Sequence, residues 1–290
     1  MVRSKVVSGA AINIATAITS AVQQQRARGE VLLSAQQDGR TRLRDLRQSG
    51  CMKVLFPNTG GAFQAVLLNS SGGVTGGDCL SVRAHAETGS HLTLTSQAAE
   101  RIYAAQPGET GQVSTRLQID ADARLDWLPQ ETILFDKAAL DRRLDVDMAT
   151  DARFLMVETL VLGRAAMGET VQSLTLRDRV TLRRGGRLLW ADATRMDHAT
   201  LPDLTGAATL NGAGAMALAA YAAPDAEAHI DTLRDMASDL PLQTRMGITL
   251  ARPDLLILRA VAADSYLLRK TLIPALERLR GAKLPRTWTI

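Results

Sequence analysis

Residues 80–87 read LSVRAHAE, and residues 113–120 read VSTRLQID. In both stretches an apolar side chain or a threonine alternates with a polar side chain. This is the pattern of a β-strand that buries one face and exposes the other. Because the alternation dominates the chain from about residue 27 to residue 200, this part of the protein is predicted to consist mainly of strands.

Three further segments carry strand signals. Residues 144–148 alternate in the same way. Residues 174–182 also alternate, and the change of phase at residues 177–178 predicts a bend or bulge there. Residues 154–162 are nearly all apolar, which predicts a strand that is covered on both faces.

Short turn signals separate these strands, for example at residues 87–90, 107–111, 120–123 and 184–186. Strands at such spacing indicate a sandwich, a barrel or a solenoid. We therefore expect a mainly β fold. Its strands would form either a β-solenoid, which resembles a β-helix, or a set of stacked sheets. We also expect one domain spanning residues 27–290, with a few α-helices in its C-terminal third.

The period of the apolar residues changes after residue 200. Alanine-rich or amphipathic patterns predict helices over residues 211–223, 227–240 and 265–280. Pro274 lies inside the last segment and predicts a kink or a boundary. Residues 248–250 and 255–258 are predicted to form a hairpin that rejoins the sheet.

The composition excludes some classes of protein. Of the 290 residues, 46% are hydrophobic and 22% are charged, which is typical of a globular protein with a buried core. The pI is about 9.4, but residues 1–50 hold eight Lys or Arg against three acids, whereas residues 51–290 hold 26 against 27. The body therefore offers no continuous basic stripe for nucleic acid, and the 3% of aromatic residues offer few stacking platforms.

The cysteines and the N-terminal stretch bear on location. Cys51 and Cys79 are too few for a disulfide framework, so both are expected to be reduced thiols in the cytoplasm.

Residues 6–22 are mildly apolar and faintly resemble a secretory leader, but polar residues interrupt them. Residues 1–26 are therefore predicted to be a disordered or partly helical extension, or an over-called start, and not a membrane segment.

A glycine-rich motif, GGVTGGD at residues 72–78, lies between two predicted strands. Its glycines imply positive φ angles or close approach of the backbone at Gly72, Gly73, Gly76 and Gly77. The Lys and the Ser or Thr of a phosphate-binding loop are replaced by Asp78 and Cys79, so nucleotide binding is not expected. A tight connection capped by the Asp78 side chain is the alternative.

Several acids lie in apolar surroundings. Glu131 and Asp136 belong to the segment WLPQETILFD and would face opposite sides of a strand. Because an unpaired buried carboxylate is costly, Glu131 is expected to meet a base, a backbone amide, a metal or a water-filled passage.

Glu158 interrupts the most apolar predicted strand, and a glycine turn with Gly163, Arg164 and Glu169 follows it. Arg164 is a plausible partner for Glu158, because a guanidinium fork satisfies a carboxylate through two hydrogen bonds.

The sequence contains no signature of a common metal site or hydrolase. It has four histidines, no CxxC and no HExxH motif, which argues against a closed zinc site. It also lacks the GxSxG motif of a nucleophile elbow. These observations favour a binding or assembly protein over an enzyme.

Five strings, in this order and spacing, resemble the UreD/UreH family of urease accessory proteins. They are LLNSSGGVTGGDCLSV, LTLTSQAAERIY, LDWLPQETILFDKA, ETLVLGRAAMGE and the C-terminal LPRTW. The resemblance runs from about residue 29 to residue 290. The chain departs from the family where Asn69, Ser70 and Ser71 replace a His-Pro-Pro type of lead-in, and where Cys79 replaces a common arginine.

The resemblance implies a β-rich, solenoid-like fold and a non-catalytic scaffold in the cytoplasm. It further implies UreF, the GTPase UreG and the urease apoprotein as partners, with no nucleic acid or membrane. Nickel would pass transiently through the interior, with no tightly bound cofactor. Acids that line or shape this passage would be Asp78, Glu131, Asp136, Glu158 and Glu169, and structural positions would be Gly72, Gly73, Gly76, Gly77, Gly163 and Arg164.

Two alternatives stay open at this point. A stand-alone nickel carrier would usually need a His-rich or Cys-rich tract to hold the metal, and this sequence has none. A glycan-active enzyme on a β-solenoid would act through the carboxylates of Glu131 and Glu158. Glu131 and Asp136, as neighbours on a single strand, do not supply the facing pair of a glycosidase by spacing alone.

Overall fold

The protein is described by a computed structural model that covers residues 25–58, 62–164 and 167–289. Most of the N-terminal stretch predicted to be an extension, residues 1–24, lies outside the described residues. Within the described residues, no helix is both long and apolar enough to cross a membrane.

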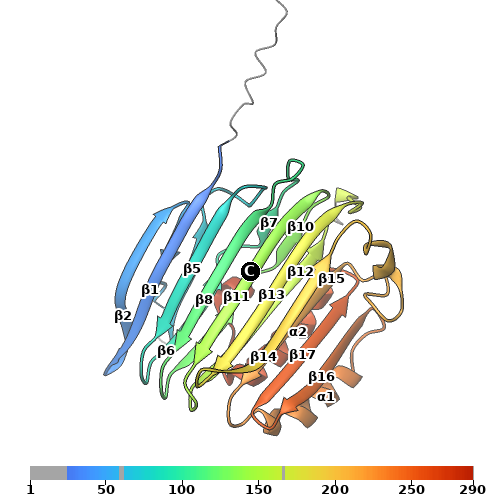
Figure 1. The fold of residues 1–290 in the computed structure, drawn as a ribbon. Helices are drawn as coiled ribbons and strands as arrows, with labels where there is room; N and C mark the ends of the chain where they lie inside the picture. Colours follow the sequence, from blue (N-terminus) through green and yellow to red (C-terminus); the bar gives the residue numbers. More distant parts are fainter. Residues whose placement is uncertain (1–24, 59–61, 165–166, 290) are drawn as a thin grey trace, which may run out of the picture.

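Two stacked β-sheets form the body (Figure 1). The seven-stranded sheet has the order β14 (Arg187–Met196), β13 (Leu174–Arg184), β11 (Ala138–Met148), β8 (Gly111–Ile119), β5 (Cys79–Ala86), β1 (Arg28–Asp38) and β2 (Arg40–Gly50). The ten-stranded sheet has the order β16 (Thr244–Arg252), β17 (Leu255–Ala262), β15 (Ala215–Ala222), β12 (Arg153–Leu162), β9 (Arg124–Leu128), β6 (His91–Ser96), β4 (Phe63–Asn69) and β3 (Met52–Leu55). Its two remaining strands are β10 (Thr132–Leu134), which pairs with β12, and β7 (Glu100–Ile102), which pairs with β10.

The chain winds between the sheets in a solenoid-like manner. From β4 to β13 it passes repeatedly from one sheet to the other, so that β5, β8, β11 and β13 are parallel neighbours in one sheet. In the other sheet, β4, β6, β9 and β12 are parallel neighbours. The prediction of a mainly β, solenoid-like or stacked-sheet fold is confirmed.

Apolar residues fill two layers. The alternating apolar residues of both sheets meet in the main core, as the period of two requires. A second core lies between the ten-stranded sheet and the helices. β12 contributes to both, because Phe154 and Met156 belong to the first core and Leu155 and Val157 to the second. The predicted strand with two covered faces is therefore confirmed.

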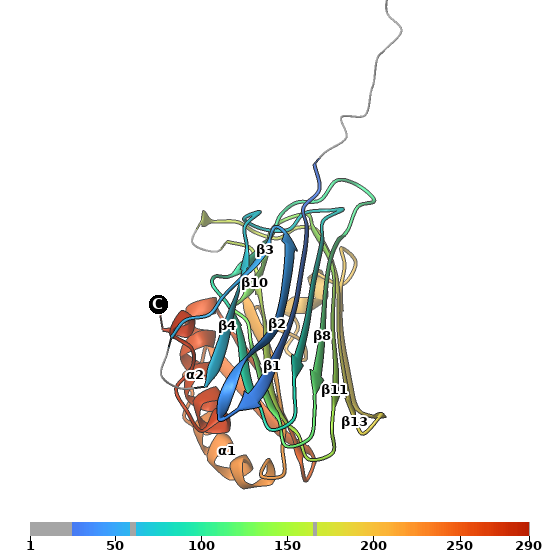
Figure 2. The same ribbon diagram turned by 90° about the vertical axis from the view of Figure 1, so that its left-hand side faces the viewer.

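The helices cover the outer face of the ten-stranded sheet (Figure 2). They are α1 (Ile230–Ser238) and α2 (Ser265–Arg280), and the short 3₁₀ segments are Pro202–Thr205, Glu227–His229 and Arg286–Trp288. Asp264 caps α2 by accepting a 2.8 Å hydrogen bond from the Leu267 amide. Gly281 ends the helix with a φ of 68°.

Three local predictions need correction or refinement. Residues 215–222 form β15 and not a helix. Alanine favours helices in isolation, but here it pairs between β12 and β17, where small side chains fit both cores. α2 continues through Pro274, so no boundary falls there. β13 pairs with β11 without interruption, and its register shift lies against β14 between Leu182 and Arg183 instead of at residues 177–178.

Candidate functional site

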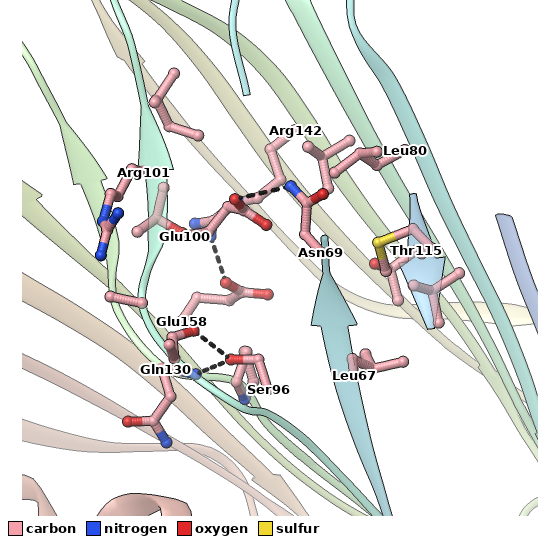
Figure 3. Close-up of a pocket in the computed structure, with 18 of the residues that line it drawn as sticks. Leu67, Asn69, Leu80, Ser96, Glu100, Arg101, Thr115, Gln130, Arg142 and Glu158 are labelled. Atoms are coloured by element: carbon pink, nitrogen blue, oxygen red, sulfur yellow. Dashed lines mark hydrogen bonds and ion pairs between the residues drawn. The ribbon is translucent and has the colours of Figure 1, made fainter. Parts of the chain in front are cut away.

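A chamber of about 260 Å³ lies between the two sheets and is the candidate site (Figure 3). Its apolar wall includes Leu67 from the ten-stranded sheet and Leu80 and Val82 from the seven-stranded sheet. Its polar wall includes Glu100 on β7 and Glu158 on β12. The chamber therefore presents carboxylates in otherwise largely apolar surroundings, where ionic interactions are strong.

A buried ionic cluster holds Glu158 in place. Its Oε1 accepts a 2.7 Å hydrogen bond from Trp127 Nε1, and its Oε2 lies 2.6 Å from Arg142 Nη1. Arg142 also donates to both carboxylate oxygens of Asp178, over 2.9 Å from Nε and 2.6 Å from Nη2. The register of β11 and β13 sets this second contact, because Arg142 and Asp178 are directly opposite each other.

The cluster contains two carboxylates and one guanidinium. Burial raises the pKa of Glu158 above its ordinary value, the positive charge of Arg142 opposes that rise, and the negative charge of Asp178 adds to it. Arg142 donates a further 2.9 Å hydrogen bond from Nη1 to Thr132 Oγ1. Glu158 is therefore fixed in position and lies in an environment that disfavours additional negative charge.

Glu100 is the second carboxylate of the chamber, and sequence reasoning did not single it out. Its Oε1 accepts a 3.1 Å hydrogen bond from Asn69 Nδ2 (Figure 3). Burial raises the pKa of Glu100 to about 7, although the hydrogen bond from Asn69 acts in the opposite direction. Near neutral pH this carboxyl group can therefore either hold or release a proton. The only signal in the sequence was its place inside the string LTSQAAERIY.

The other four acids expected to line a passage have structural partners and do not line the chamber. Glu131 forms a 2.9 Å ion pair with Arg269 of α2, on the helix side of the sheet. Asp78 caps its turn as predicted, because it accepts hydrogen bonds from the Thr75 amide over 2.8 Å and the Ala27 amide over 2.7 Å.

The remaining two acids organise a neighbouring loop. Asp136 Oδ1 accepts hydrogen bonds from the amides of Gln172 and Ser173, over 2.8 and 2.9 Å. Glu169 forms a 2.9 Å ion pair with Arg164. The expectation that Arg164 would pair with Glu158 is wrong, because β12 carries Glu158 into the interior, whereas Arg164 lies beyond the end of the strand.

The glycine positions are structural in the way the sequence predicts. A Cβ atom at Gly73 would lie 2.3 Å from Tyr103 Cε2 and 2.7 Å from the Arg101 carbonyl oxygen, so only glycine fits. Gly72 and Gly77 have φ angles of 80° and 81°. Gly72 also lines the chamber, which places this loop at its boundary.

The remaining glycines are closely packed. A Cβ atom at Gly76 would lie 2.6 Å from Glu109 Cβ. Gly163 has a φ of 71°, and a Cβ atom there would lie 3.2 Å from the Glu169 carbonyl oxygen. Both positions therefore favour glycine.

The geometry separates the two carboxylates that the glycosidase alternative would need to bring together. Glu131 faces α2 and Glu158 faces the chamber, so they do not form the facing pair that a glycosidase requires. Among the described residues, no three His, Cys, Asp or Glu side chains gather in a metal-binding group. Two carboxylates, those of Glu100 and Glu158, line the chamber.

Comparisons with known proteins identify the family of this chain. A family model described as UreD urease accessory protein matches residues 25–289. The urease accessory protein UreD of Ruegeria pomeroyi is 49% identical over 246 residues, covering 84% of this chain and 94% of that protein. Its counterpart from Rhizobium etli is 45% identical over 278 residues, covering 95% of this chain and 100% of that protein.

A further counterpart, from Roseobacter denitrificans, is 43% identical over 270 residues and covers 93% of this chain and 97% of its own. The class that these matches define is the urease accessory proteins. Within that class, the chain belongs to the UreD family.

Proposed function

We propose that this chain is a non-catalytic, cytoplasmic scaffold of urease maturation. In this proposal it binds UreF, UreG and the urease apoprotein, and nickel crosses its interior as cargo through the chamber between the sheets. The observation that carries the proposal is the pair of carboxylates, Glu100 and Glu158, on the wall of this chamber. The name shared by its relatives supplies the urease context.

The number of metal ligands in the chamber suits the transit of nickel better than its storage. Proteins usually hold a divalent transition metal tightly with three or four ligands. The chamber offers two carboxylates, and Glu158 is already engaged by Trp127 and Arg142. A cation in the chamber would therefore meet few strong ligands, which allows it to leave again.

Glu100 and Glu158 have different parts in the proposal. Glu158 is held by two partners, Trp127 and Arg142, so it is less free to turn toward a passing cation. Glu100 has one side-chain hydrogen bond, from Asn69, and a pKa of about 7. An arriving dication would displace its proton and stabilise the carboxylate, so Glu100 is the group expected to contact nickel directly.

Loading of urease in cells tests this proposal. The structural and accessory genes are co-expressed with the wild-type chain, with the double variant Glu100→Gln and Glu158→Gln, or with Glu277→Gln. Glu277 is the control because it forms a peripheral ion pair with the exposed Lys283. Nickel per urease, urease activity and UreF co-purification are measured together.

We expect the double variant to lower nickel content and activity by about tenfold or more while UreF still co-purifies, as is typical when ligating groups are lost. The control should match the wild type. Normal nickel content in the double variant would disprove the route through the chamber. Failure of the wild-type chain to retain UreF would disprove the scaffold role.

A further inference from the structure

A second hollow lies on the outer face of the seven-stranded sheet, away from the chamber. It is a groove of about 590 Å³, and its lining includes the arginines Arg47, Arg83 and Arg116. We call it the arginine groove. Figure 2 shows α1 and α2 on the opposite side of the molecule, over the ten-stranded sheet, so they do not cover this groove.

Strand register gathers the three arginines. Arg83 on β5 is directly opposite Arg116 on β8. On the other side, Arg83 is opposite Leu32 of β1, which is in turn opposite Arg47 of β2. Side chains in such a row point to the same face of a sheet. The row therefore runs Arg47, Leu32, Arg83 and Arg116, with the leucine between two of the three cationic side chains.

The three arginines are exposed, and their guanidinium groups have no close carboxylate partner within the described chain. Arg47, Arg83 and Arg116 form no ion pair or side-chain hydrogen bond with any other described residue. On the same face, Arg143 and Arg179 do have carboxylate partners, in Asp145 and Asp141. Like charges directly opposite each other destabilise a sheet. Arg116 is also directly opposite Asp145 of β11, so this carboxylate, which already pairs with Arg143, offsets part of the repulsion between Arg83 and Arg116.

The acids in the groove bear on what it can bind. Asp45 already accepts a 3.0 Å hydrogen bond from Ser34 Oγ and lies 3.4 Å from Arg44 Nε. Asp147, also in the lining, would repel a continuous, densely charged phosphate chain more strongly than a segment whose carboxylates are spaced to avoid it. Leu32 and Leu46 add apolar surface. Spaced carboxylates with an apolar side chain between them fit this mixture better than a polyphosphate or a nucleic acid.

We propose that the arginine groove is a docking site for an acidic segment of a protein partner, whose carboxylates pair with Arg47, Arg83 and Arg116 and whose apolar side chain rests on Leu32. Guanidinium groups bind carboxylates with two parallel hydrogen bonds, which suits this role. Residues 1–24 contain no Asp or Glu, so they cannot supply such carboxylates. The proposal does not depend on the nickel route.

Fluorescence anisotropy with the full chain tests the groove. The probe is a short labelled peptide of Glu and Asp with one central Leu, and the same peptide with Gln and Asn is the uncharged comparison. The test variant carries Arg83→Gln and Arg116→Gln. The matched control carries Arg177→Gln and Arg187→Gln, which removes the same charge from exposed positions of the same sheet outside the groove.

We expect the acidic peptide to bind in a salt-dependent manner, and the test variant to weaken binding by about tenfold or more, because hydrogen bonds to charged groups are lost. The control should change binding by less than about twofold, as for exposed charges. Equal loss in both variants would overturn the proposal, because diffuse charge would then explain binding.

Competition and sedimentation distinguish other occupants. If tripolyphosphate or a single-stranded oligonucleotide displaces the peptide at lower concentration than unlabelled peptide does, the proposed occupant is wrong. If the wild-type chain dimerises and the test variant does not, a second copy is the occupant and the proposal also fails. As an independent readout, the test variant should unfold at the same or a higher urea concentration than the wild type, because like charges are removed. A clear loss of stability would mean that these arginines serve the fold.

Discussion

Arg280, the last residue of α2, donates a 3.0 Å hydrogen bond from Nε to Oδ2 of Asp126 on β9. Asp126 is fully buried and also accepts a 2.9 Å hydrogen bond from Arg124 Nε, while His91 Nε2 lies 3.0 Å from its Oδ2. Burial alone would raise the pKa of Asp126, but the hydrogen bond from His91 and the charges of Arg124 and Arg280 hold it below its usual range. An ionic cluster thus fastens the C-terminal helix to the sheet.

Replacing Arg280 by Gln should therefore destabilise the fold strongly. The change removes one cation from a buried carboxylate, and breaking a buried pair costs about 3–5 kcal/mol. Urea unfolding followed by circular dichroism measures the loss. Lys283→Gln is the control, because the Lys283 side chain is 90% exposed and its pair with Glu277 contributes at most about 1 kcal/mol. Equal midpoints for the two variants would contradict the prediction.

Arg142 should be as important for the stability of the chamber wall as Arg280 is for the attachment of α2. Replacing it by Met leaves Glu158 and Asp178 buried without their shared cation, and we expect a loss of about 3–5 kcal/mol in the free energy of unfolding. Adding Glu158→Gln and Asp178→Asn to the same chain should recover part of the loss, because the uncompensated charges disappear. A triple variant that is no more stable than Arg142→Met would show that packing, not charge, explains the loss.

Glu100 should make stability depend on pH. Its pKa is about 7 in the folded chain, above the ordinary value for glutamate, so the folded state binds the proton more tightly than the unfolded state. The contribution of Glu100 is therefore most favourable at low pH and is lost as pH rises through about 7. Glu100→Gln should gain more stability relative to the wild type at pH 8 than at pH 5, measured from urea midpoints. A pH-independent difference would rule out the raised pKa.

The loop that borders the chamber should tolerate no side chain at Gly73. Gly73→Ala would force a Cβ atom against the Tyr103 ring and the Arg101 carbonyl, and overpacking of this kind costs about 1–3 kcal/mol. Gly247→Ala is the matched control, since no atom lies within 4 Å of a Cβ at that position. Thermal unfolding should separate the two variants, with Gly247→Ala near the wild type.

Sequence reasoning predicted strands where one face is buried, because alternation records burial directly, as in residues 80–86 and 113–119. It failed for β15, since alanine carries almost no periodic signal and its pairing with β12 and β17 is set by distant residues. The helices at residues 230–238 and 265–280 were predicted because their apolar stripes repeat at helical spacing.

The candidate site was predicted only in part. Glu158 stood out because it interrupts an apolar strand, but its partner Arg142 comes from the other sheet, and no local pattern could reveal that pairing. Glu100 lies on a strand of only three residues, which is too short to show a period. The numbers of basic and acidic residues are nearly equal over residues 51–290, which predicted no basic surface. The register of β2, β5 and β8 nevertheless brings arginines together in one groove.

The hydrogen bond between Trp127 and Glu158 gives the protein a built-in optical probe. The chain has three tryptophans, and of these only Trp127 lines the chamber. Indole emission responds to a charge placed against the ring nitrogen, so in a chain whose Trp190 and Trp288 are replaced by Phe the remaining emission should report the charge of Glu158. Adding nickel to such a chain would test, without an attached dye, whether the cation enters the chamber.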